Sequence, residues 1–190
     1  MLTIFEESRE KIIDAIQNDS DLFRIAPKDI QDDYEIALIA IKINCCLLEY
    51  VSKRLKNNKT IVLEAVKEYG RTLQFASKEL KDNFEIVLEA VKENSRSIQF
   101  ASHNLRNNYD IVLIAVKGSG WALQYVSDVL KSDYNIVFEA VKKDGNSLKF
   151  ASDELKDNLE IVKAAMKNNP KSRIFASTKL KNSNKLNMFY

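Results

Sequence analysis

The hydrophobic and polar positions along this chain recur with a period of 25 residues. Leu80 to Asn104 reads LKDNFEIVLEAVKENSRSIQFASHN, and Leu105 to Val129 reads LRNNYDIVLIAVKGSGWALQYVSDV. A fixed period in this range is typical of stacked arrays, in which each unit buries its apolar face against its neighbours. Positions are numbered from one within each copy, and the copies begin at Phe5, Ile30, Leu55, Leu80, Leu105, Leu130 and Leu155.

The pattern within a copy predicts two helices. Apolar residues at positions five, eight, nine and twelve, with Ile at seven and Ala at eleven, predict a first helix packed on at least two sides. Asp or Asn at position three with an acidic residue three places later, as in Asp82 and Glu85, predicts its start by a capping box. Asn at position fifteen or Gly at position sixteen, as in Asn94 and Gly145, predicts a left-handed residue at its end. A shorter second helix is expected to follow, as at residues 97–101.

Two further columns of residues predict specific contacts. Ser at position 23 occurs in six copies and is expected to cap the next turn of backbone. A small side chain at position eleven of every copy predicts close approach of neighbouring helices, because a larger one would overpack the interface. These alanines are Ala15, Ala40, Ala65, Ala90, Ala115, Ala140 and Ala165.

Together these patterns predict an all-α fold, a right-handed or superhelical α-solenoid of seven 25-residue helix-turn-helix repeats. A single domain is expected over residues 1–180, followed by a tail over 181–190. The first copy, and the last with Lys163 and Arg173 at normally apolar positions, are expected to act as polar caps. The tail ends in the apolar Met188–Tyr190, which either docks on the last repeat or forms a short linear contact.

Composition indicates the class of protein and the compartment in which it is expected. The chain is 45% hydrophobic and 29% charged, as in ordinary soluble proteins, and its 29 basic and 27 acidic residues give no strong overall charge. Adjacent Cys45 and Cys46 cannot reach ordinary disulfide geometry without strain, which favours a reducing compartment. No signal peptide and no membrane-spanning apolar run is apparent. We therefore expect a cytoplasmic protein with no membrane partner, and export by other signals stays open.

The repeat resembles a known family. The pattern (L)-(K/R)-(D/N)-(D/N)-aromatic-E-I-V-L-x-A-V-K, followed by G/S-x-x-L-Q-(F/Y)-A-S-x-x-L, resembles the repeats of domain of unknown function 4116. The resemblance covers residues 30–180, and the first copy only in part, because Arg9, Lys11 and Pro27 replace the usual aromatic, Ile and Ser. It implies a helical repeat module of the kind found in bacterial proteins, including secreted effectors, and in protist proteins. It supplies no activity and no catalytic residue.

The sequence offers little for catalysis. The single histidine, His103, lies at a variable position without a nucleophile that it could serve. There is no glycine-rich phosphate loop and no His/Cys spacing for zinc. Cys45 and Cys46 are interpreted as packing or surface substitutions, because nothing near them in sequence would lower a thiol pKa. We therefore expect no enzyme, no catalytic residue, no metal site and no cofactor.

Two columns of positive charge suggest nucleic-acid binding as an alternative function. In a stack, each column would form a ladder that could follow a phosphate backbone. The lysines at position thirteen could instead complement the helix dipole and pair with Glu three residues earlier, as Glu64, Glu89 and Glu139 would allow. Position thirteen holds Lys42, Lys67, Lys92, Lys117, Lys142 and Lys167, and position two holds Lys56, Lys81, Arg106, Lys131, Lys156 and Lys181.

Departures from the repeat favour a protein partner. Ile39 and Ile114 replace Glu at position ten, Ile43 lies at position fourteen, and the only tryptophan, Trp121, lies at position seventeen. Because positions ten, fourteen and seventeen are expected on one helical face, these residues predict an apolar contact surface with Trp121 as its hot spot. They could also fold against adjacent loops. The preferred hypothesis is a non-catalytic scaffold that binds a protein partner and possibly inhibits it, as an effector or immunity protein would.

Overall fold

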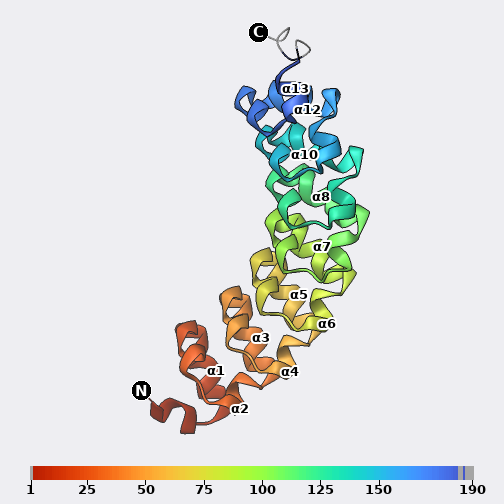
Figure 1. Cartoon of the computed structure of the whole chain (residues 1–190). Helices are drawn as coiled ribbons and strands as arrows, with labels where there is room; N and C mark the ends of the chain where they lie inside the picture. The colour runs from red at the N-terminus through yellow and green to blue at the C-terminus, as the bar shows by residue number, and fades with distance from the viewer. Residues whose placement is uncertain (1, 184–185, 187–190) are drawn as a thin grey trace. The chain divides into compact units, whose positions relative to one another are not determined.

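The computed structural model describes residues 2–183 and 186, and this part of the chain consists of helices and connections without strands (Figure 1). It divides into two compact units, Met1–Glu93 and Asn94–Tyr190, called here the N-terminal and the C-terminal unit. Each unit is described by itself. The tail residues Met188–Tyr190 lie outside the described residues, and a single domain over residues 1–180 stays a prediction.

Long α-helices, 3-10 helices, which are labelled η, and short helices alternate in both units. The N-terminal unit contains η1 (Leu2–Glu6), α1 (Arg9–Asn18), η2 (Ser20–Ile25), α2 (Lys28–Gln31), α3 (Tyr34–Ile43), η3 (Cys45–Glu49), α4 (Lys53–Lys56), α5 (Lys59–Glu68), η4 (Gly70–Phe75), α6 (Lys78–Lys81) and α7 (Phe84–Glu93). The C-terminal unit contains η5 (Ser95–Phe100), η6 (Leu105–Asn107), α8 (Tyr109–Gly118), η7 (Gly120–Tyr125), α9 (Asp128–Lys131), α10 (Tyr134–Lys143), η8 (Gly145–Phe150), α11 (Asp153–Lys156), α12 (Leu159–Asn168), η9 (Pro170–Phe175) and α13 (Thr178–Lys181).

The described elements recur with the period of the sequence. A ten-residue α-helix is followed by a 3-10 helix of five or six residues and then by a short helix of three or four. The long helices pack in chain order within each unit, α1, α3, α5 and α7 in one and α8, α10 and α12 in the other (Figure 1). The two predicted helices are present, and the third, short helix was missed because four residues carry no helical periodicity of their own.

The long helices begin one residue later than the capping-box pattern predicts. The residue at position four, Asn or Asp, accepts a hydrogen bond from the backbone amide of position seven, as Asn108 Oδ1 does from Ile111 at 3.1 Å. The same bond starts α3, α5, α7, α10 and α12. Position three instead lies at the C-terminal end of the preceding short helix, as Asn57 does after α4.

The serine at position 23 ties successive short helices together. Ser77 Oγ accepts a hydrogen bond from the amide of Leu80 and so caps α6, as predicted, at 3.1 Å. Its own amide donates to the carbonyl of Lys56 at 2.9 Å, and its hydroxyl donates to Asn57 Oδ1 at 2.6 Å. In other copies the hydroxyl donates to a carboxylate, and this bond, with a second one from a basic residue, holds the pKa of Asp32 and of Asp157 below the usual value.

The glycines at position sixteen allow close approach and do not provide left-handed backbone. No described residue has a positive φ, so the predicted left-handed helix ends are wrong. A Cβ on Gly145 would lie 2.2 Å from the carbonyl oxygen of Ala165, and Gly70 faces Ala90 in the same way. These contacts explain the alanine column, since all its members except the half-buried Ala15 are completely buried. The Asn residues at position fifteen are extended and cap the 3-10 helices, as Asn94 does.

Candidate binding surface

The long helices present an exposed face in both units, made by positions five, six, nine, ten, thirteen and fourteen and called here the long-helix face. Position five carries aromatic side chains with exposed fractions of 38–46%, namely Tyr34, Phe84, Tyr109 and Tyr134. The prediction that position five belongs to the buried stripe is wrong. The signal was available, because Arg9 and Lys59 occupy the same position and cannot be buried without a partner.

Exposed apolar side chains are concentrated on the long-helix face. Of the ten large apolar side chains that are exposed among the described residues, six lie there: Tyr34, Ile43, Phe84, Tyr109, Ile114 and Tyr134. Scattered exposed apolar groups are normal on protein surfaces, whereas groups gathered on one face indicate a contact site.

Polar side chains on this face also join neighbouring long helices. In three copies the residue at position five bonds to the glutamate at position six of the next copy: Arg9 to Glu35, Lys59 to Glu85 and Tyr134 to Glu160. Tyr134 Oη donates to Glu160 Oε2 at 3.0 Å, and Lys59 Nζ to Glu85 Oε2 at 2.6 Å. The ammonium group lowers the pKa of Glu85, and the carboxylate of Glu160 raises the pKa of Tyr134. These bonds join successive long helices across the face.

The four residues predicted to contact a partner are divided between the two units. Ile43, which is 50% exposed, and the half-buried Ile39 lie on α3 in the N-terminal unit. Ile114 lies on α8 in the C-terminal unit and is 36% exposed. Trp121 lies in η7, after α8 has ended at Gly118, so positions ten, fourteen and seventeen do not share a helical face as predicted.

Trp121 packs against the following repeat. Its indole Nε1 donates a hydrogen bond to Asp144, and its ring meets the Phe150 ring edge-on with centroids 5.5 Å apart. The ammonium group of Lys149 lies 4.2 Å from the Trp121 ring centroid and 4.6 Å from that of Phe150. The structure thus favours the alternative that this tryptophan folds against adjacent elements, and it leaves only part of the ring for a partner.

The lysine columns differ in how firmly they are held. The lysines at position thirteen are all exposed, and two of the three predicted ion pairs form, Lys92 with Glu89 at 2.8 Å and Lys142 with Glu139 at 3.1 Å. Lys67 and Glu64 are not paired in the described structure. At position two, Lys81 is half-buried and donates to the carbonyl of Gln74 at 2.6 Å, and burial lowers its pKa. The other lysines of this column are also bonded to the preceding repeat, namely Lys56, Lys131, Lys156 and Lys181.

Charge is divided unevenly between the two units. The N-terminal unit contains 14 basic and 18 acidic residues, and the C-terminal unit contains 15 basic and 9 acidic residues. Their net charges are therefore −4 and +6, which the overall charge of +2 conceals. This asymmetry is hidden in the total charge and appears only when the residues are counted unit by unit. Lys117, Lys142 and Lys167 lie in the basic unit.

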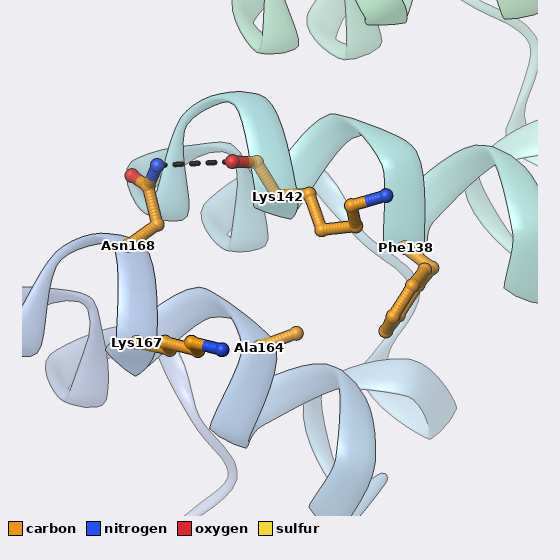
Figure 2. Close-up of a pocket in the computed structure, with 5 residues that line it drawn as sticks. All are labelled: Phe138, Lys142, Ala164, Lys167 and Asn168. Carbon is orange, nitrogen blue, oxygen red and sulfur yellow. Dashed lines mark hydrogen bonds between the residues drawn. The ribbon is translucent and has the colours of Figure 1, made fainter.

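A pocket of about 500 Å³ lies between α10 and α12 on the long-helix face. Figure 2 shows Phe138 and Lys142 on one helix, and Ala164, Lys167 and Asn168 on the next. Asn168 Nδ2 donates to the carbonyl of Lys142 at 2.9 Å, and its Oδ1 accepts from the amide of Gly145 at 2.7 Å. The pocket combines an aromatic ring, a methyl group and two ammonium groups.

The two cysteines are free, Cys45 half-buried and Cys46 exposed. Burial and the neighbouring Cys46 raise the pKa of Cys45 to about 11, which is the opposite of what an activated thiolate requires. His103 is exposed. Over residues 2–183 and 186, no group of three or more His, Cys, Asp or Glu side chains could hold a metal ion. No helix in that part of the chain has the length and apolar character to cross a bilayer.

The sequence profile of one known family follows the repeat along most of the chain. It matches residues 8–56, 33–81, 83–131 and 133–181, and each match spans about two copies of the repeat. The chain belongs to the family described as domain of unknown function (DUF4116). No curated protein and no solved structure matches the chain. The resemblance inferred from the repeat pattern is thereby confirmed, and the overlapping matches, the first two offset by 25 residues, agree with the period of the helices.

Proposed function

We propose that this DUF4116 protein is a non-catalytic scaffold that binds a protein partner along its long-helix face. Its seven copies stack as one superhelical α-solenoid, with the polar first and last copies as caps. Binding to such a surface would block or recruit the partner without chemistry. The observation that carries the proposal is the concentration of exposed aromatic and isoleucine side chains on a face where hydrogen bonds join successive long helices.

A binding selection tests this proposal. Random peptides displayed on phage are enriched on the immobilised full chain, and the affinities of recovered peptides are measured for variants. We expect the double variant Tyr109→Ser/Ile114→Ser to bind these peptides at least tenfold more weakly, because both side chains lie on the long-helix face of α8.

The chain offers a matched control for that variant. Val129 and Ile174 are 71% and 66% exposed in the same unit but lie in α9 and η9, away from the face. Val129→Ser/Ile174→Ser removes comparable apolar surface and should leave the affinities unchanged. Equal losses in both variants, or no enriched peptide at all, would argue against the proposed function.

The net charge of +6 in the C-terminal unit favours nucleic-acid binding as a second candidate. In that case Lys117→Glu/Lys142→Glu/Lys167→Glu should weaken binding of a labelled single-stranded RNA in fluorescence anisotropy at least tenfold and flatten its salt dependence. Charge reversal at Lys131, Lys156 and Lys181 changes the net charge equally, but these side chains are already bonded to the preceding repeat. Equal effects of the two triple variants would show attraction by net charge alone.

A further inference from the structure

The pocket between α10 and α12 exists because the repeat is broken there in two places. Position nine, which is Leu in four copies, is Phe138 in α10. Position ten, which is acidic or Ile in every other copy, is Ala164 in α12. The ring supplies an apolar wall, and the methyl group leaves space where a longer side chain would otherwise lie.

The adjacent groove between α8 and α10 shows the smaller cavity that forms where position ten keeps its acidic residue. It is lined by the equivalent residues Lys117, Glu139, Lys142 and Lys143, and its volume is about 170 Å³. Here Glu139 occupies the place of Ala164, and its carboxylate pairs with Lys142 at 3.1 Å. Replacing one acidic side chain by a methyl group therefore both opens the larger pocket and removes its internal anion.

The chemistry of the pocket selects for an apolar group beside negative charge. Lys142 and Lys167 are exposed at its rim, Glu139 balances only one of them, and the unit around them carries a net charge of +6. Inside, Phe138 and the methyl group of Ala164 offer apolar contact. An aromatic or aliphatic side chain with carboxylates next to it would satisfy both parts of the site.

The pocket is poorly equipped to recognise a nucleotide. Asn168, its one amide side chain, already donates to the carbonyl of Lys142 and accepts from the amide of Gly145, so little remains to read the edge of a base. The ring of Phe138 is stacked on Tyr134 with centroids 5.8 Å apart and an interplanar angle of 11°, and the Lys142 ammonium lies 5.6 Å from its centroid. A base could not be enclosed between two free aromatic faces.

We infer that this pocket is the anchor site for an acidic peptide segment of the partner, which inserts one apolar side chain between α10 and α12 while its carboxylates pair with Lys142 and Lys167. The inference rests on the proposed function and names the chemistry of the partner. It also explains why this gap alone, among the grooves described above, lacks the acidic side chain of the repeat.

The test uses short synthetic probes and the full chain labelled with ¹⁵N. The acidic probe is acetyl-Asp-Glu-Phe-Asp-Glu-amide, its neutral counterpart is acetyl-Asn-Gln-Phe-Asn-Gln-amide, and adenosine monophosphate represents nucleotides. We expect the acidic probe to shift the amide signals of Ala164, Lys167 and Asn168 saturably, with at least tenfold higher affinity than the other two.

Restoring the repeat supplies the decisive variant. Ala164→Glu places the common acidic residue back at position ten and should weaken binding of the acidic probe at least tenfold. Asn135→Glu adds the same charge at exposed position six of α10, where five other copies are acidic, and should have little effect. If Ala164→Glu unfolds the unit, Lys167→Glu at an exposed site provides the same test.

Each remaining outcome overturns the inference. Absence of saturable shifts at the pocket, equal binding of the neutral probe, or equal effects of the two glutamate variants would show that it is not an acidic-peptide anchor. Stronger binding of adenosine monophosphate would assign the pocket to nucleotides. Selected peptides that depend on Tyr109 and Ile114 but not on Ala164 would retain the proposed function while removing this inference.

Discussion

Replacing Gly145 with alanine should destabilise the C-terminal unit by about 2–3 kcal/mol, in the range found for overpacked interiors. The added Cβ would lie 2.2 Å from the carbonyl oxygen of Ala165 and 3.1 Å from the amide nitrogen of Asn169, and both are backbone atoms of the neighbouring repeat. Neither can move aside by a side-chain rotation. Urea unfolding followed by the fluorescence of the single tryptophan, Trp121, reports on this unit directly.

Gly118 provides the matched control. A Cβ there would meet only the side chain of Ser95, which can rotate, and alanine favours the last turn of α8 by up to about 1 kcal/mol. Gly118→Ala should therefore be neutral or stabilising. A further variant separates the two explanations of Gly145, because a left-handed helix end would tolerate asparagine, whereas a close approach would not. Stability retained in Gly145→Asn would contradict the packing explanation.

Truncating Trp121 to alanine should cost the same unit about 2–3 kcal/mol, because the indole bridges two repeats. The change removes the edge-on contact with Phe150, the ring beneath the Lys149 ammonium and the hydrogen bond to Asp144. Thermal unfolding followed by circular dichroism measures the effect. Trp121→Phe, which retains a ring but not the indole N–H, should lose less than half as much.

Ile114 is the appropriate comparison for Trp121. Both residues were predicted to contact a partner, but Ile114, unlike Trp121, is exposed to solvent on α8. Ile114→Ala should therefore alter stability by no more than about 0.5 kcal/mol. If Trp121→Ala left stability unchanged and only weakened peptide binding, the tryptophan would be a partner contact, as its sequence position suggested. The two variants thus distinguish a residue that joins repeats from one that faces solvent.

The sequence predicted the long helices because their signals are periodic and local. Apolar spacing located α8 and α10, and Ser77 was recognised as a cap because its bond to the amide of Leu80 lies within one turn. Gly145 was misinterpreted because glycine serves two purposes, backbone freedom and close approach, and only the position of Ala165 in the neighbouring repeat decides between them.

The candidate surface was harder to predict, since it depends on which side of each helix faces solvent. The apolar spacing assigned Tyr109 and Tyr134 to the buried stripe, but both are exposed. Arg9 and Lys59 at the same position of other copies indicate this exposure. The pocket could not be predicted, because it forms only where Phe138 of α10 lies opposite the short side chain of Ala164 on α12. Spatial neighbours one period apart are not visible in any single copy.

The bonds made by the serine at position 23 have a consequence for the length of the chain. Ser77 reaches back 20 residues to Asn57 and 21 to Lys56, and Ser127 does the same to Asn107 and Arg106. Every such closure is short in sequence, so each forms at a small entropic cost and needs no distant segment to fold first. Inserting or deleting one residue between the partners would shift the helices out of register. Adding 25 residues at equivalent points would preserve every bond, so the array could lengthen by whole copies without losing these contacts.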